Sequence, residues 1–212
     1  MASWLGRLKI RHNIKFIQVS GERAATDQVG ADDWIKNVLP EVIAGYDPND
    51  VFNADETGLF YRVAPSGTLD VAGSQPTGGK TPKDRVTVLF ICNSTGSDKK
   101  AIAIGKYKSP RCFKDSRPPL PYYSSANAWM TSWIWSDILK KFDRELGSRK
   151  IILFADNAAC HKLVDVELKN IQIVFMTPNT TSLIQPLDQG IIRTAKVYYR
   201  TQVMRKMHSS DQ

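Results

Sequence analysis

The sequence predicts an α/β domain, in which helices pack on both sides of a mixed sheet. Two short, continuously apolar segments, 150–156 and 171–176, are typical of strands that are buried on both faces. An amphipathic helix, ended by Gly147, is predicted over 131–146, and a further helix over 190–207. Because strands come first and are followed by strand, helix, strand and helix, the order of elements favours this fold class.

Local patterns predict the remaining elements. Residues 31–46 have apolar positions at helical spacing, and Pro40 is expected to break or kink that helix. Four segments rich in β-branched or aromatic residues are predicted to be strands: 51–56, 59–64, 85–93 and 101–107. The first two are expected to pair across a turn at Thr57-Gly58. A short helix is expected after the first apolar strand. Irregular chain is expected over three stretches: 73–84, 109–126 and 177–189.

Charge points toward a polyanionic partner. The chain carries 29 Lys and Arg against 21 Asp and Glu, which gives a formal net charge of +8. Basic residues are concentrated in three runs, 7–23, 80–117 and 193–207. For any single run a solvated basic face is the simpler interpretation, whereas three runs in one chain favour contacts with phosphate groups.

Cysteine usage and hydropathy bear on the compartment. Three cysteines, an odd number without CxxC spacing, argue against a disulfide framework and favour a reducing compartment. The opening segment lacks the apolar core of a secretory signal. No apolar run approaches the length needed to span a membrane. We therefore expect a soluble intracellular protein with no membrane partner.

Three acidic residues stand where strands of such a sheet end. Asp55 lies in the first predicted strand, Asp156 ends an apolar strand, and Asp188 precedes the last helix. Ligands gather at the carboxyl ends of strands in open α/β sheets, so these carboxylates could converge on a hard cation. Basic surroundings make a phosphodiester the expected substrate. Two bound metals would then activate the attacking oxygen and stabilise the leaving one.

Each acid also has a purely structural interpretation. Asp55 could cap a turn, while Asp156 and Asp188 could cap the helices that follow them. The neighbours Cys160 and His161 could suggest zinc, but two adjacent candidates without two more at the proper spacing are poor evidence for it. A supporting or structural role is the better interpretation of His161.

Three motifs in order resemble one family: NADETGLF (53–60), FADNAACH (154–161) and TPNTTSLIQPLDQGIIRTAKVYYR (177–200). They look like the DDE-superfamily transposases of the pogo/Tigger type, a group that includes the jerky proteins and centromere protein B. The resemblance runs from about residue 4 to the end. It implies an RNase H-like fold, a mixed five-stranded sheet flanked by helices. It also implies that Asp55, Asp156 and Asp188 hold two Mg²⁺ or Mn²⁺ ions.

The implied reaction is metal-assisted attack by water on a DNA phosphodiester, followed by attack of the new 3′-hydroxyl on target DNA. Three residues beside the acids are expected to support them: Glu56, Asn157 and His161. A domesticated, non-catalytic DNA- or chromatin-binding protein is the alternative, and an inactive partial transposon copy is a third interpretation. The family acts in the nucleus, which is the expected location.

The resemblance also divides the chain. Residues 1–24 are expected to be the remnant of an N-terminal helix-turn-helix module, and 25–50 a linker helix. Residues 51–212 would form the endonuclease domain, short at its C-terminal end. Five basic residues near the strands are expected to contact DNA phosphates: Lys80, Lys83, Arg85, Lys106 and Lys108. The basic final helix could instead serve homodimerisation, or it could simply stay solvated.

Overall fold

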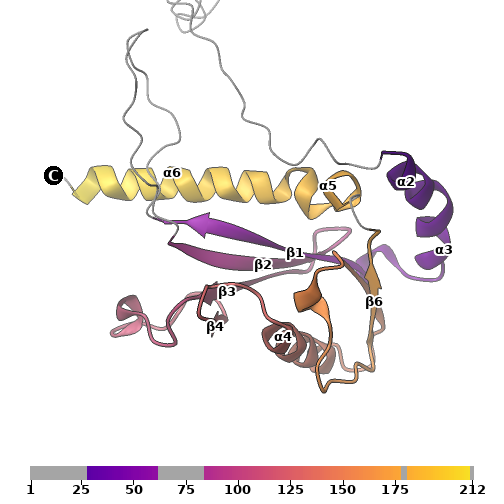
Figure 1. Ribbon diagram of the computed structural model, residues 1–212, viewed down its shortest axis with the longest axis horizontal. Helices are drawn as coiled ribbons and strands as arrows, with labels where there is room; N and C mark the ends of the chain where they lie inside the picture. Colours follow the sequence, from indigo (N-terminus) through magenta and orange to yellow (C-terminus); the bar gives the residue numbers. More distant parts are fainter. Residues whose placement is uncertain (1–27, 62–83, 178–180, 211–212) are drawn as a thin grey trace, which may run out of the picture.

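One six-stranded mixed sheet forms the centre of the structure, a computed structural model that describes residues 28–61, 84–177 and 181–210 (Figure 1). The strands lie in the order β4-β3-β2-β1-β5-β6. Their bounds are β1 (Val51–Phe60), β2 (Arg85–Asn93), β3 (Lys99–Gly105), β4 (Tyr122–Ser124), β5 (Ile151–Ala155) and β6 (Ile171–Phe175). β2 is antiparallel to both of its neighbours, whereas β1–β5, β5–β6 and β3–β4 are parallel pairs. The predicted mixed sheet is therefore confirmed.

Helices cover both faces of this sheet, as predicted. Their bounds are α2 (Gln28–Asp33), α3 (Leu39–Val42), α4 (Ser132–Glu145), α5 (Thr181–Ile184) and α6 (Ile192–Ser210), with the π-helical turns η2 (Trp34–Val38) and η6 (Leu187–Ile191). α4 lies on one side of the sheet, and α6 runs along β1 on the other (Figure 1). Alternate residues of β5 enter different cores: Leu153 packs with α4, whereas Ile152 and Phe154 pack with α2 and α5.

Local sequence explains the best predicted helix. The side chain of Thr131 caps α4 by accepting a hydrogen bond from the amide of Ile134 at 3.2 Å. One apolar face of the helix, which includes Trp135 and Phe142, is buried against the sheet. Gly147 has a φ of +63°, a left-handed conformation that suits glycine at the end of a helix.

The predicted turn at Thr57-Gly58 is wrong, because β1 passes straight through it. All residues from 52 to 60 are paired with β2 in one antiparallel register, with Thr57 opposite Val88 and Gly58 opposite Thr87. The local turn signal is weaker than the pairing with the long, β-branched strand β2. The result is one ten-residue strand in place of two short ones.

Other differences occur where the chain was expected to be irregular. β4 lies within 109–126 and pairs with the edge of β3, which gives the sheet one strand more than the five that the family resemblance implied. α5 lies within the stretch 177–189. The short helix expected after β5 is a single 3-10 turn, η5 (Ala159–His161). The helix expected over 31–46 ends at α3 and contains the π-helical turn η2 just before Pro40.

Some expectations lie outside the described residues. These are the helix-turn-helix remnant over 1–24, most of the loop over 73–84, and Lys80 and Lys83. Within the described ranges, no helix is long and apolar enough to cross a membrane.

The packing of β4 on β3 generates a prediction. Gly105→Ala is expected to lower the free energy of unfolding by about 1–3 kcal/mol and the melting temperature by ~3–10 °C. The new Cβ would lie 2.9 Å from Cζ of Tyr122, whose hydroxyl is held by the carbonyl of Tyr107 at 2.6 Å. Gly58→Ala is the matched control, since its Cβ would meet Arg85 at an ordinary 3.4 Å. Equal melting temperatures for the two variants would contradict this packing.

Candidate functional site

A buried asparagine joins three segments of the chain. The Asn53 side chain on β1 donates to the carbonyl of Phe154 on β5 at 3.1 Å and accepts from the amide of Leu187 at 3.1 Å. The fully buried Gln185 donates to the carbonyl of Ala54 at 3.0 Å. These hydrogen bonds hold the beginning of η6 against the middle of β1, because a buried amide that loses its partner is costly.

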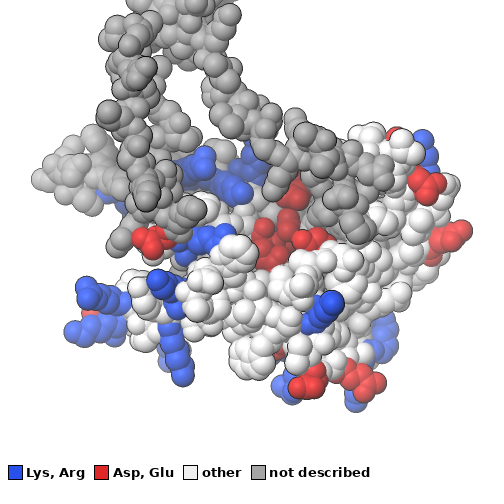
Figure 2. Space-filling view, in the orientation of Figure 1, with Lys and Arg blue, Asp and Glu red and all other residues white. Residues whose placement is uncertain are grey.

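The three predicted acids follow closely on the residues that these hydrogen bonds join. β1 and β5 run parallel with Asn53 opposite Phe154, and Asp55 and Asp156 each follow two residues later. Asp188 is the second residue of η6. The register of the sheet and the attachment of η6 therefore bring the three acids to one edge of β1. Figure 2 shows a group of acidic side chains in the middle of this face of the molecule.

Burial and neighbouring negative charges both oppose the ionisation of Asp55. The residue is only 9% exposed. Burial, followed by the negative charges of Asp188, Glu56 and Asp156, raises the pKa of Asp55 from 3.8 to about 8. A hydrogen bond from the amide of Glu56 at 2.8 Å opposes this shift without cancelling it. Asp188 and Asp156 are thus close enough to Asp55 to affect its ionisation.

The carboxylates suit a divalent cation by their chemistry. Carboxylate oxygens are the ligands that Mg²⁺ and Mn²⁺ prefer, and a cation would relieve the repulsion at Asp55. In the described part of the chain, however, no three His, Cys, Asp or Glu side chains are already gathered so that they could hold an ion. Ligation would require the side chains of these acids to close in.

His161 bridges the acids on the other side of the site. Its Nε2 lies 2.9 Å from Glu56 Oε1, and its Nδ1 lies 2.5 Å from Asp156 Oδ1. Its ring is 1% exposed and lies 4.3 Å from that of Trp135. Burial lowers the pKa of His161, but hydrogen bonds with Asp156, Cys160 and Glu56 outweigh it and raise the pKa to about 12. With a carboxylate at each nitrogen, the ring is an imidazolium that donates from both.

Asp55 and Asp156, which follow paired residues of β1 and β5, therefore differ in protonation. The hydrogen bond from His161 is the largest influence on Asp156 and lowers its pKa below 3.8. Asp156 stays ionised at pH 7, while Asp55 holds its proton until about pH 8. Ligation of a cation by both carboxylates would therefore require Asp55 to release its proton.

The residues predicted to support the acids behave differently from one another. Glu56 and His161 form a continuous chain with Asp156. Asn157 is exposed and makes no hydrogen bond with any acid within the described ranges. Asp156 also accepts a long hydrogen bond of 3.4 Å from the amide of Ala158, so a weak cap exists there without a following α-helix.

The three predicted DNA contacts that the structure describes lie near β2 and β3. Arg85 begins β2, and its guanidinium lies 4.4 Å from the centre of the Trp129 ring. Lys106 and Lys108 are exposed just after β3, where Lys106 lies 5.7 Å from the Tyr107 ring. In Figure 2, basic side chains flank the acidic group on the side toward the C-terminal end of α6.

The residues that position the site were not predicted from the sequence. Asn53 and Gln185 lie within the quoted motifs, but no role was predicted for them. No local pattern distinguishes Asn53, because β1 also carries the polar residues Asp55, Glu56 and Thr57. Trp135 is buried in the core, and its ring lies 4.3 Å from that of His161, a contact that no sequence pattern indicated.

Comparison with known proteins identifies relatives along the whole chain. The DDE superfamily endonuclease family matches residues 83–212. Tigger transposable element-derived protein 4 of Mus musculus is 35% identical, over 98% of this chain and 41% of the relative. Jerky protein homolog of Homo sapiens is also 35% identical, over 90% of this chain and 36% of the relative. Major centromere autoantigen B of Homo sapiens is 29% identical, over 79% of this chain and 28% of the relative. The chain thus spans about two fifths or less of the length of these relatives.

Solved structures confirm the fold. The Mos1 transposase paired-end complex with left transposon end has a TM-score of 0.52 and 11% identity, covering 91% of this chain and 55% of that one. The Mos1 mariner paired end complex with Mn has a TM-score of 0.51 and 13% identity, covering 91% and 56%. The fold is RNase H-like, as the sequence resemblance implied.

The raised pKa of Asp55 generates a prediction. The folded state holds a proton that the unfolded state has lost above pH 3.8, so stability falls as pH rises from there to about 8. Asp55→Asn is therefore expected to stabilise the metal-free protein at pH 8 by about 1–3 kcal/mol, or ~2–10 °C in melting temperature. The gain should shrink at pH 5. Mn²⁺ should raise the melting temperature of the wild type at pH 8 and leave that of the variant unchanged.

Asp143→Asn is the matched control for this experiment. Asp143 is also buried, at 8% exposure, but its carboxylate accepts a hydrogen bond from the amide of Asn170 at 2.6 Å. This substitution should destabilise the protein at both pH values. If Asp55→Asn also lowered the melting temperature at pH 8, the carboxylates would not repel one another as described.

Proposed function

The chain belongs to the DDE superfamily of endonucleases, and we propose that it is a metal-dependent DNA endonuclease domain that hydrolyses a phosphodiester and then performs strand transfer. One observation carries the proposal. Two carboxylates from separate segments, Asp188 and Asp156, act on a third, the buried Asp55 of the central strand β1, and raise its pKa. Retaining a buried and repelled carboxylate is costly, and such a cost is typical of functional sites.

In this proposal the three acids hold the metal. Mg²⁺ or Mn²⁺, when bound, would activate the attacking oxygen and stabilise charge on the leaving oxygen. His161 keeps Asp156 ionised and fixes its orientation from the side of α4. Asn53 fixes the distance between β1, β5 and η6, and so the position of Asp188. Asp55 would have to release its proton to ligate a cation.

DNA is the proposed partner. The net charge of +8 and the basic side chains beside the acidic group support it. One of the structures with a similar fold is a transposase complex with a transposon end. The nucleus is the proposed location, because DNA is there and because one relative is named as a centromere autoantigen. The helix-turn-helix remnant over 1–24, the linker over 25–50, the endonuclease domain over 51–212 and a homodimer remain part of the proposal.

A non-catalytic DNA- or chromatin-binding domain is the second candidate. The ion pair between His161 and Asp156 favours it, because this pair occupies an oxygen that a metal would need. Sequence relatives include a jerky protein homolog and a centromere autoantigen, whose names do not refer to transposition. One fold can serve several functions, so membership of the family does not decide between the two candidates.

Cleavage of supercoiled plasmid separates the two candidates. Purified protein with Mn²⁺ is expected to nick the plasmid, and Asp156→Ala to reduce the rate by about 10²-fold or more because a metal ligand is removed. Asp165→Asn, at an exposed loop position with a φ of +51°, is the control that should retain the full rate. A wild-type protein that binds DNA without nicking it in Mg²⁺ or Mn²⁺ would support the non-catalytic candidate.

The salt dependence of DNA binding tests the predicted phosphate contacts. Replacing Arg85, Lys106 and Lys108 with Ala should reduce the slope of log affinity against log salt by about 0.9 for each phosphate that is no longer neutralised. A matched triple variant replaces three other exposed lysines: Lys140, Lys162 and Lys169. It should keep the slope of the wild type. Equal slopes for the two triple variants would show that the predicted residues do not bind phosphates.

A further inference from the structure

A large cavity lies on the sheet face that carries Asp55. Its volume is about 1100 Å³. Its floor consists of alternate residues on three neighbouring strands: Leu59 and Tyr61, Val86 and Val88, and Ala103 and Gly105. Its walls come from the segment 106–120 and from Tyr199 of α6. The helix α6 therefore borders both the acidic group and this cavity.

The register of the sheet relates the cavity to the acids. Side chains alternate along a strand, so Asp55, Leu59 and Tyr61 belong to one face. At about 3.4 Å per residue, the cavity begins roughly 14 Å beyond Asp55 and extends to roughly 20 Å. A DNA strand that follows β1 from the acids would reach the cavity within about four to six nucleotides, at about 3.4 Å per nucleotide of a stacked strand.

The lining has the chemistry of a site for nucleobases. Five aromatic residues line it: Tyr61, Tyr107, Phe113, Tyr122 and Tyr199. The rings of Tyr61 and Tyr107 are accessible, at 42% and 61% exposure. The charged members are three cations, Arg85, Lys106 and Arg111, and the lining contains no acid among the described residues. Aromatic rings bind the faces of bases, while Lys and Arg bind the phosphates between them.

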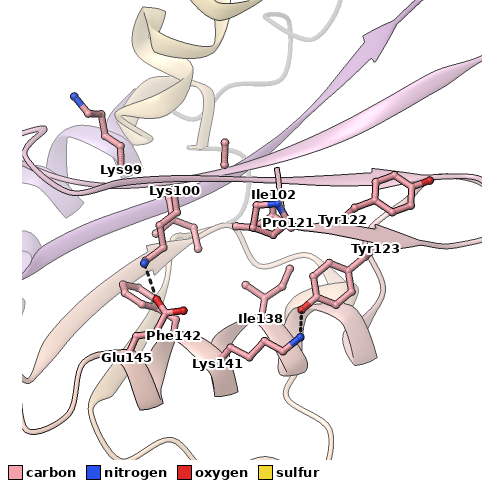
Figure 3. Close-up of a pocket in the computed structure, with 12 residues that line it drawn as sticks. Lys99, Lys100, Ile102, Pro121, Tyr122, Tyr123, Ile138, Lys141, Phe142 and Glu145 are labelled. Carbon is pink, nitrogen blue, oxygen red and sulfur yellow. Dashed lines mark hydrogen bonds and ion pairs between the residues drawn. The ribbon is translucent and has the colours of Figure 1, made fainter. Parts of the chain in front are cut away.

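A second cavity provides a contrast. It has a volume of about 570 Å³ and lies between β3 and α4, on the opposite face (Figure 3). Two of its cations are neutralised: Lys100 is 2.7 Å from Glu145, and Lys141 is 2.8 Å from Asp137. The first cavity keeps its positive charge next to aromatic rings, so it is the one that fits a nucleic acid.

We propose that the first cavity binds unpaired bases of a DNA strand whose phosphodiester lies at Asp55. A paired base has its faces covered by its neighbours in the stack, so only an unpaired base can lie against the ring of Tyr107 or Tyr61. The direction of the strand rests on the proposed endonuclease function. Binding of the bases requires neither metal nor cleavage.

Fluorescence anisotropy with the full chain in EDTA tests this inference. The probes are an oligothymidylate and a duplex of the same length. Tyr107→Ala is expected to weaken binding of the single strand by about 5- to 100-fold, because one stacking platform is removed. Binding of the duplex should change by less than about twofold, since its bases remain stacked on one another. Tyr198→Ala is the matched control, since Tyr198 is 68% exposed on α6 and does not line the cavity. It should leave both affinities unchanged.

A second readout excludes a trivial loss of folding. The fluorescence of a 2-aminopurine base placed in the single strand should be quenched when the wild type binds it and not when Tyr107→Ala binds it. The wild type and the variant should have equal melting temperatures. The inference is wrong if Tyr107→Ala binds the single strand like the wild type, or weakens both probes equally. It is also wrong if an acidic peptide of the same charge competes as well as the oligonucleotide. EDTA removes the metal and so prevents nicking, which makes this binding assay independent of cleavage. A chain that does not nick DNA could still bind unpaired bases, and a chain that nicks DNA could fail to bind them.

Discussion

The hydrogen bonds of Asn53 are the constraint on which the rest of the site depends. One buried side chain links β1 to β5 and to the beginning of η6, segments that are far apart in the sequence. Because each bond is buried, losing one partner would leave an unsatisfied amide or carbonyl and cost about 1–3 kcal/mol. The sheet alone aligns Asp55 with Asp156, whereas Asp188 reaches them through the attachment of η6.

Around Asn53, some carboxylates are paired with a positive charge and others repel one another. The α4 side of the site carries an imidazolium, His161, between Glu56 and Asp156 and against the ring of Trp135. The α6 side carries Asp55 and Asp188, which repel each other. His161 therefore already compensates negative charge at Glu56 and Asp156, and the proposed metal would relieve the repulsion that remains at Asp55. The aromatic cavity beyond Asp55 extends this same α6 side, so the proposed chemistry and the proposed base binding share one surface.

Local sequence patterns predicted the elements whose formation depends mainly on their own residues. The amphipathic face of α4 and the fully buried strand β5 form where predicted, because burial of their apolar residues decides them. β6 also forms where predicted, but the prediction that it is buried on both faces is wrong, because it is an edge strand on which Gln172 and Phe175 are exposed. The turn at Thr57-Gly58 failed because β2, which follows in the chain, pairs across it. β4 was missed because three residues at a sheet edge have no periodic pattern. The roles of Asn53 and Gln185 could not be predicted, since a buried amide is explained only by partners that the fold brings from elsewhere in the chain.

The most direct test of the central claim is the titration of the Asp55 carboxyl group by ¹³C NMR in metal-free protein. We expect a pKa of about 8, because burial and the charges of Asp188, Glu56 and Asp156 oppose ionisation. We also expect this pKa to fall when Mg²⁺ is added. A pKa near the ordinary 3.8, unchanged by Mg²⁺, would show that the carboxylates do not form one site.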